Sequence, residues 1–510
     1  ALIGGDARIR ADIGAGGIGH LWIVALVIAA DAGAHGDGGR IIVWSDEVTR
    51  FDGHLSARGG TSSGDGGFAE ISGKQSLILT GTADLNAPHG GRGTLLLDPE
   101  WIRIIDSDLA PPAADDGEYE FEEDEYVSAV VGNRAIERLL ENGNVVLQAS
   151  MDIIQDADAH IDVSGVEGAT GRALTLEAGR DITLNGNITL REGALTLHAV
   201  QDITLAGTVT TGGGVTLEAG RTIDMQGGTI LAGSSAVDLE ADEEITLGLI
   251  TTSGDVTLAA GGAITAGSGS EIRGDTLMIT GASIGSDAAR LNTSVEVLSA
   301  TASTGGIYIT EQDGLRLQNL RADAGDVRIT STAGDIEVGE IDAVNVALDA
   351  AAGAIRDDDN DATRISASGG IALSAHTGIG TVADFSADDD AAVGSALGVS
   401  TSGTLSAEVA SATGQIHLDI AGAPLVGAGA LRLGDGSASA GTIVLRSGGD
   451  LNLGGLSAGA LAIGSANTTR VGLRSGGGLT LPAGGLAYHA PAQLLVRGAT
   501  DVVGAGATRT

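Results

Sequence analysis

Hydrophobic and polar residues alternate in short runs across residues 174–284, and the same run returns six times. Most copies read apolar-x-apolar-x-Ala, followed by a turn rich in glycine or charge and then by Ile-x-apolar. The first frame of starting residues is Leu174, Leu195, Val215, Val237, Val256 and Leu277, and the second is Ile182, Ile203, Ile223, Ile245, Ile264 and Ile284. Both frames keep the same irregular spacing of 19 to 22 residues. A shared period of this length indicates that each copy is one coil of a solenoid.

Within one copy the alternation has a period of two, which is typical of β-strands with one buried face. Turn residues such as Gly179 and the pair Asn185-Gly186 separate three strands of three to five residues. Such strands, closed into rings and stacked, predict an all-β fold, a right-handed parallel β-helix (β-solenoid) of about 20-residue coils. One inner column is predicted to consist of Leu176, Leu197, Leu217, Leu239 and Leu258. A single coil cannot fold alone, so we expect stability to come from stacking.

The negative charge of the chain limits the kinds of partner that it can bind. The chain has 67 Asp and Glu against 27 Lys and Arg, a net charge of −40, and Lys74 is its single lysine. Such a surface repels nucleic acid and anionic membranes, so we expect no nucleic-acid binding and no membrane insertion. The sequence has no cysteine, which excludes disulfides, thiol catalysis and cysteine-bound zinc. The apolar run at residues 21–30 is too short to span a bilayer, and we interpret it as a buried strand.

The repeat divides the chain into four expected segments. Residues 1–100 and 143–345 are expected to be β-helix, and residues 346–510 a less regular continuation of it. Residues 101–142 interrupt the rhythm with an acidic run at residues 115–125, in which tyrosine and phenylalanine are interleaved. We therefore expect an acidic loop and a short helix to be inserted into the β-helix there.

The helix of this insertion is predicted over residues 134–141. Ile136, Leu139 and Leu140 have helical spacing, and the following Asn142-Gly143 is a typical helix end. Two interpretations of the insertion stay open. It is either a solvated loop or an interaction site where acidic and aromatic residues meet a basic partner or calcium.

A second acidic cluster suggests a metal site. Asp357, Asp359 and Asp361 place carboxylates at alternate positions, and calcium takes six to eight oxygen ligands. The glycine and terminal glutamate of an EF-hand loop do not follow, so an ordinary solvated loop is the alternative. A third acidic run contains Asp384 and residues 388–390. Calcium is the one cofactor that the sequence suggests, and we expect no other.

The outward positions of the coils form a polar, shallow face. Glu218 and Glu240 are expected one coil apart, like a pair of catalytic carboxylates, but any repeat stacked on itself produces such pairs. No cluster of aromatic residues for sugar stacking accompanies them. The nine histidines are scattered without a short-range pair. We therefore expect no catalytic residues, and a polysaccharide-active enzyme on a β-helix is the alternative.

Three sequences in residues 37–99 carry a family resemblance. They are DGGRIIVWS from Asp37, DGGFAEISGK from Asp65 and GTLLLDP from Gly93. They resemble filamentous-haemagglutinin-type exoproteins, and LEAGRDITL from Leu176 resembles the haemagglutinin repeats of that family. The resemblance is specific over residues 37–99, extends over the repeats, and carries no catalytic residues.

The resemblance implies secretion by the two-partner route, in which an outer-membrane transporter exports a long β-helical rod from a Gram-negative bacterium. The secretion domain of that family normally lies upstream of the Trp44 region, so we expect an internal segment of a longer protein, able to associate end to end. We expect a non-catalytic structural or adhesive rod that is secreted or displayed at the cell surface. Its expected partner is a host-cell or matrix glycan or protein.

Overall fold

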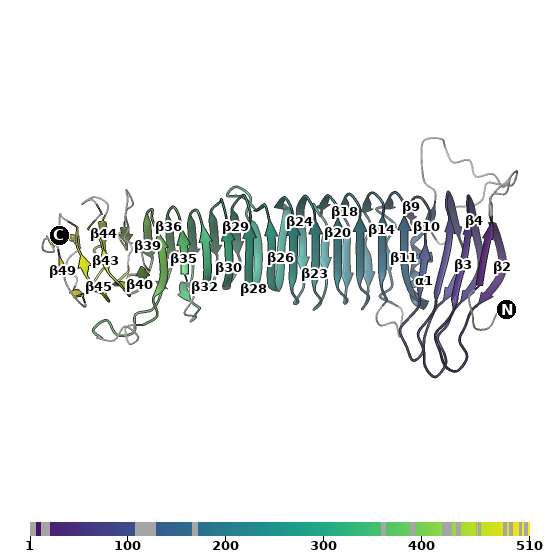
Figure 1. Ribbon diagram of the computed structural model, residues 1–510, viewed down its shortest axis with the longest axis horizontal. Coiled ribbons are helices and arrows are strands. Elements are labelled where there is room, and N and C mark those ends of the chain that lie inside the picture. The colour runs from purple at the N-terminus through teal and green to yellow at the C-terminus, as the bar shows by residue number, and fades with distance from the viewer. Residues whose placement is uncertain are drawn as a thin grey trace. The chain divides into compact units, whose positions relative to one another are not determined.

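The structure is a computed structural model (Figure 1), and it divides into two compact units. Unit 1 comprises Ala1–Gly261 and Gly267–Ser270, and unit 2 comprises Gly262–Ala266 and Glu271–Thr510. The described residues are 7–11, 21–107, 129–165, 172–358, 364–387, 394–420, 431–434, 440–454, 456, 461–482, 487–488, 493–498, 502–503 and 508–509.

The described residues of unit 1 form strands and one helix. Its elements are β1 (Ala7–Ala11), β2 (Leu21–Ala29), β3 (Arg40–Ser45), β4 (Val48–Ser56), β5 (Phe68–Gly73), β6 (Ser76–Leu79), β7 (Thr82–Asp84), β8 (Thr94–Leu97), β9 (Ile102–Ile105), β10 (Val130–Gly132), α1 (Asn133–Asn142), β11 (Asn144–Ala149), β12 (Ile153–Gln155), β13 (Ile161–Asp162), β14 (Leu174–Ala178), β15 (Ile182–Leu184), β16 (Ile188–Leu190), β17 (Leu195–Ala199), β18 (Ile203–Leu205), β19 (Thr208–Thr211), β20 (Val215–Ala219), β21 (Thr222–Asp224), β22 (Thr229–Leu231), β23 (Val237–Ala241), β24 (Glu244–Thr251) and β25 (Val256–Ala260).

Unit 2 consists of strands in its described residues, and β26 begins at its boundary with unit 1. The strands are β26 (Ala263–Gly281), β27 (Ser283–Ile284), β28 (Leu291–Ala302), β29 (Ile307–Glu311), β30 (Leu315–Ala322), β31 (Val327–Ser331), β32 (Ile336–Ala343), β33 (Val346–Ala350), β34 (Ala354–Asp357), β35 (Arg364–Ala367), β36 (Ile371–Ala375), β37 (Gly378–Ile379), β38 (Leu397–Thr401), β39 (Leu405–Val409), β40 (Gln415–Ile420), β41 (Leu431–Leu433), β42 (Thr442–Ser447), β43 (Leu451–Asn452), β44 (Leu461–Ile463), β45 (Arg470–Ser475), β46 (Leu479–Thr480), β47 (Ala487–Tyr488), β48 (Gln493–Gly498), β49 (Val502–Val503) and β50 (Thr508–Arg509).

The first strands of successive coils pair in parallel and in register. β14, β17, β20, β23 and β25 bring Leu176, Leu197, Leu217, Leu239 and Leu258 into one column. Each of these leucines is at most 1% exposed. The predicted inner column is therefore confirmed, and each unit is a parallel β-solenoid.

The second strands form an equivalent column. Ile182, Ile203, Ile223 and Ile245 pair in succession and are at most 1% exposed. The division of a coil into three strands is not constant, however. β24 pairs with both β21 and β22, so the second and third strands have become continuous in that coil. The sequence predicted the period and the buried faces of the coils. It did not predict this fusion, because two strands that continue without a bend need no turn residue between them.

Successive coils lie close together at the turn that contains Gly220. A Cβ atom on Gly220 would lie 2.2 Å from the carbonyl oxygen of Val200 in the preceding coil, so a larger residue would push the two coils apart. The next residue, Arg221, donates from Nε to Asp202 at 3.1 Å, again in the preceding coil. Small residues and coil-to-coil ion pairs therefore fix the stacking of this turn.

The segment assigned to the acidic insertion contains regular structure at both ends. β9 pairs with β10 and β12, so the stack extends to Ile105. The predicted helix is confirmed as α1, which buries Ile136, Leu139 and Leu140. The acidic run at residues 115–125 lies outside the described residues.

The predicted strand at residues 21–30 is β2, but only one of its faces is buried. Ile23 and Ile28 are buried, whereas Trp22 and Val24 are each 61% exposed and Val27 is 58% exposed. β2 pairs with β4, and their register shifts between Val24 and Val27. The prediction of a buried strand is therefore wrong for the outward face, because strand alternation directs these apolar side chains away from the core.

Candidate functional site

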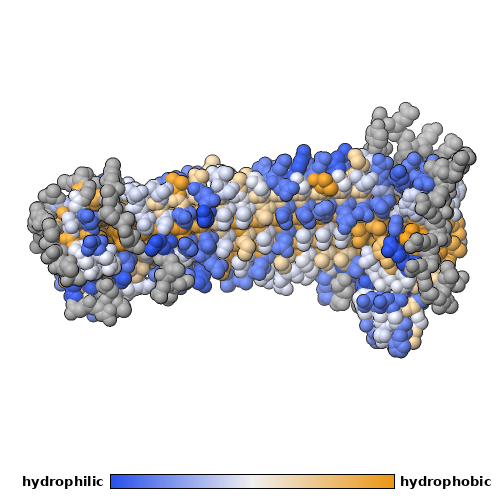
Figure 2. Space-filling view, viewed as in Figure 1, coloured by the Kyte–Doolittle hydropathy of each residue, from blue (hydrophilic) through white to orange (hydrophobic). Residues whose placement is uncertain are grey.

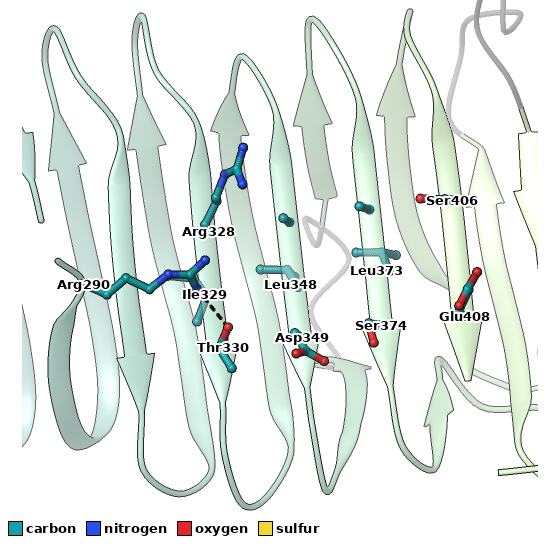
Figure 3. Close-up of a pocket in the computed structure, with 12 residues that line it drawn as sticks. Arg290, Arg328, Ile329, Thr330, Leu348, Asp349, Leu373, Ser374, Ser406 and Glu408 are labelled. Carbon is teal, nitrogen blue, oxygen red and sulfur yellow. Dashed lines mark hydrogen bonds between the residues drawn. The ribbon is translucent and has the colours of Figure 1, made fainter. Parts of the chain in front are cut away.

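A shallow groove lies on the outer face of unit 2, over four successive strands, β31, β33, β36 and β39 (Figure 3). Its volume is about 370 Å³. A second hollow of about 270 Å³ continues it toward the turns of the same coils. The two hollows share Arg328, Ala347, Ala372 and Ser406, and together we call them the outer groove.

Strand register determines which side chains meet in the outer groove. The pairings of β31 with β33, β33 with β36, and β36 with β39 are continuous across the site. They align two outward columns, one of Arg328, Ala347, Ala372 and Ser406 and the other of Thr330, Asp349, Ser374 and Glu408.

Small side chains create the hollow. Ala347 and Ala372 lie between the long side chain of Arg328 and the hydroxyl of Ser406. The residues that alternate with these positions, such as Leu348, are buried and form the core beneath the groove. A strand whose inward residues fill the core while its outward residues are alanine leaves open space above the sheet.

The end of the outer groove at β31 carries two arginines, Arg290 and Arg328, which are paired with two aspartates. Arg290 donates to the Thr330 hydroxyl at 3.0 Å, as the dashed line in Figure 3 shows, and to Asp287 at 3.1 Å. Arg328 lies 3.6 Å from the other oxygen of Asp287 and donates to Asp326 at 3.3 Å. Two guanidinium groups therefore converge on Asp287, whose side chain is 59% exposed.

The other end of the outer groove is acidic and rich in hydroxyl groups. Asp349 is half-buried and Glu408 is exposed. Ser374 separates them in the column, so their backbones are two coils or about 10 Å apart. The carboxylates at this end accept hydrogen bonds, whereas the guanidinium groups at the arginine end donate them.

The predicted calcium ligands are only partly described. Asp357 is the last residue of β34, and Asp359 and Asp361 lie outside the described residues. The neighbouring Asp358 carboxylate lies 3.1 Å from Arg316 and is 5% exposed. Within the described ranges, no group of three or more histidine, aspartate or glutamate residues is placed to hold a metal ion. The calcium site stays a prediction.

The third acidic run is also divided by the limits of the description. Asp384 is described, and its carboxylate accepts hydrogen bonds from the backbone N–H and the hydroxyl of Ser386. Both bonds hold the pKa of the Asp384 carboxyl below its usual range, and the bond from the hydroxyl contributes most. Residues 388–390 lie outside the described residues.

The outward columns of unit 1 agree with the sequence prediction. Glu218 and Glu240 pair in register on adjacent strands, and His198 lies on the other side of Glu218, with Nε2 3.9 Å from the carboxylate. All three side chains are exposed. Hydrophilic residues cover much of the face shown in Figure 2. The carboxylates are thus neighbours on an open surface.

The sequence prediction missed the outer groove, although a signal was present. β33 reads VALDA and β36 reads IALSA, so alanine occupies an outward position in both strands. Strands favour β-branched and aromatic residues at such positions, and three consecutive coils of unit 1 carry Thr175, Thr196 and Thr216 there. Two outward alanines in consecutive coils indicate a hollow.

No family model matches this chain, and no curated protein is detectably similar to it. In the parts of the chain that the structure describes, no helix is long and apolar enough to cross a membrane. The fold itself is that of a parallel β-solenoid, a repeat protein in which each coil contacts its neighbours.

Proposed function

We propose that this chain is a non-catalytic structural and adhesive scaffold, secreted or displayed at a bacterial cell surface, of the filamentous haemagglutinin type. The observation that carries the proposal is the in-register repetition of outward side chains. Thr175, Thr196 and Thr216 follow one another on adjacent strands, about 4.8 Å apart. Repetition multiplies a weak surface contact, because linked contacts gain from their high effective concentration.

The family resemblance coincides with the structural repeat, which supports the same proposal. The sequences from Asp37, Asp65 and Gly93 contain β3, β5 and β8, respectively. These strands pair in register, with Ile42 opposite Glu70 and Glu70 opposite Leu96. The resembling residues therefore form consecutive coils of one stack.

The proposed partner is a host-cell or matrix glycan or protein, and the proposed export partner is an outer-membrane transporter. Binding of the purified, fluorescently labelled chain to epithelial cells and to matrix-coated surfaces tests the adhesive role. We expect saturable binding that an excess of unlabelled chain abolishes. We also expect that the chain does not chemically alter the surface to which it binds. An absence of saturable binding to every surface would contradict adhesion.

One observation favours a second candidate, a polysaccharide-active enzyme. The backbones of Asp349 and Glu408 lie in one column about 10 Å apart, a spacing from which two carboxylates can reach the separation of roughly 6.5–9.5 Å found in inverting glycosidases. A general acid in such enzymes needs a protected site, however, and Glu408 is exposed. A reducing-sugar assay separates the two functions, because turnover that is lost in Glu408→Gln would support the enzyme.

A further inference from the structure

We propose that the outer groove binds an oligosaccharide that carries a single carboxylate near one end. This inference rests on the proposed adhesive function and names the ligand class and the surface that recognises it. The carboxylate lies at Arg290 and Arg328, and the sugar hydroxyls follow the column from Thr330 to Glu408.

The position of the groove favours a glycan over a peptide. β31, β33 and β36 each pair with a strand on both sides, so the ladder already uses their backbone hydrogen-bonding groups. A peptide that extends a sheet needs an unpaired strand edge. The groove instead offers hydroxyl, carboxylate and guanidinium groups on a sheet face, which suit the many hydroxyls of a sugar.

The dimensions fit a short oligosaccharide. From Thr330 to Glu408 the column crosses three coil steps, or about 14 Å. Ala347 and Ala372 leave room for sugar rings to lie across the coils, and their methyl groups offer apolar contact to the ring faces. Ser374 and Ser406 each present a hydroxyl that can both donate and accept.

The arrangement of charged side chains in the groove favours a ligand with one acidic group. Arginine binds carboxylate through two parallel N–H···O bonds, and the five donors of each guanidinium exceed the contacts to Asp287, Asp326 and Thr330. At the opposite end, Asp349 and Glu408 accept hydrogen bonds from hydroxyls but repel a second anion. The site therefore selects one carboxylate and disfavours a polyanion.

Calorimetric titration of the whole chain with three sugars at constant ionic strength tests the selectivity. The probes are sialyllactose, which has one carboxylate, lactose, which has none, and a heparin-derived tetrasaccharide, which has many anionic groups. We expect sialyllactose to bind at least about tenfold more tightly than either of the other two, because a charge-assisted hydrogen bond is lost or a repulsion is added. Equal or tighter binding of lactose or of the heparin fragment would overturn the proposal.

Variants locate the site. Arg328→Gln should weaken sialyllactose binding about tenfold, and Ala372→Leu should weaken it at least as much by filling the groove. Thr216→Leu is the matched control, since it enlarges an equivalent outward position in unit 1. The double variant Asp349→Asn with Glu408→Gln should raise the affinity for the heparin fragment several-fold. Thermal unfolding of each variant shows whether the fold is intact.

The two proposals can fail separately. If the chain adheres to cells but Ala372→Leu binds sialyllactose as the wild type does, the groove proposal is overturned and the adhesive function stands. If sialyllactose binding depends on Arg328 and Ala372 but the chain adheres to no surface, the site stands and the adhesive function falls.

Discussion

The guanidinium of Arg474 donates a hydrogen bond of 2.9 Å to the carbonyl oxygen of Phe385, which precedes it by 89 residues. Arg474 also donates to the carbonyl oxygen of Ala387 at 3.0 Å, and Arg497 reaches the same oxygen at 3.2 Å. Residues 381–387, which we call the strap, therefore lie across β45 and β48 on the outer face of unit 2. The strap therefore contacts coils whose residues come much later in the sequence.

Phe385 is the apolar anchor of the strap. Its side chain packs against Val444, and a Cβ atom on Gly472 would lie 3.2 Å from its ring. Phe385→Ala is expected to lower the free energy of unfolding of unit 2 by about 3–5 kcal/mol, because it leaves a cavity under the strap. Chemical denaturation measures this loss. Ser386→Ala is the control, because the side chain of Ser386 is exposed, and an equal effect of the two substitutions would show that the ring does not anchor the strap.

His417 holds the beginning of the strap and makes it sensitive to acid. Its Nδ1 donates to the carbonyl oxygen of Thr381 at 2.7 Å, and its buried Nε2 has no hydrogen-bond partner in the described structure. Burial lowers the pKa of His417, and the nearby Arg446 and Arg474 lower it further, while the bond to Thr381 opposes the shift. The folded chain therefore keeps this imidazole neutral below the ordinary pKa of 6.5.

The sign of the pH effect follows from this lowered pKa. As the pH falls below 6.5, the unfolded chain gains a proton that the folded chain does not, so stability falls until the pH reaches the lower folded pKa. The slope is at most about 1.4 kcal/mol per pH unit. His417→Gln should remove this contribution, which denaturation at pH 7.5 and at pH 5.5 or so would measure as a difference between variant and wild type. An identical pH dependence of the two proteins would contradict a neutral His417.

The coil period and the inner columns could be predicted because they depend on local alternation. Leu176 and Leu197 are placed by the same five-residue run in two coils, and stacking requires only that the run be repeated. The outward surface follows a different rule. Strand alternation shows that Trp22 points outward, but the apolar character of the run suggested burial, and Trp22 is exposed.

The outer groove and the strap could not be predicted in the same way. The column that runs from Asp349 through Ser374 to Glu408 joins residues that are 25 and 34 positions apart in the sequence, and these intervals depart from the regular period. The contact of Arg474 with Phe385 depends on how a loop folds back over later coils. Such relationships depend on where each coil stacks, which the local pattern does not specify.

Leu217 tests the solenoid core. It pairs with Leu197 and Leu239 in the inner column and is fully buried. Leu217→Ala should lower the free energy of unfolding of unit 1 by about 2–5 kcal/mol, because its neighbours in the stack cannot close the cavity. The adjacent Thr216 points outward, so Thr216→Ala should change stability by about 0.5 kcal/mol or less. Urea denaturation of both variants checks the assignment of the two faces, and a larger loss in Thr216→Ala would reverse it.

Glu311 should oppose the effect of His417 on the pH dependence of unit 2. Its carboxyl is buried at the end of β29, where it accepts a hydrogen bond of 2.6 Å from the Thr293 hydroxyl. Burial raises its pKa to about 7, although the bond from Thr293 works against this shift. Between pH 4.5, the ordinary pKa of a glutamate, and pH 7 or so, the folded chain therefore keeps a proton that the unfolded chain has released. The stabilisation that is present below pH 4.5 is lost as the pH rises to about 7.

Glu311→Gln keeps the shape of the side chain and cannot ionise. We expect it to be more stable than the wild type by about 1–3 kcal/mol at pH 8, and to approach wild-type stability near pH 5. Denaturation of both proteins across this range measures the difference, and the same experiment in the His417→Gln background separates the two titrations. A variant less stable than the wild type at pH 8 would contradict the raised pKa of Glu311, because it would mean that the folded chain stabilises the carboxylate through bonds such as the one from Thr293.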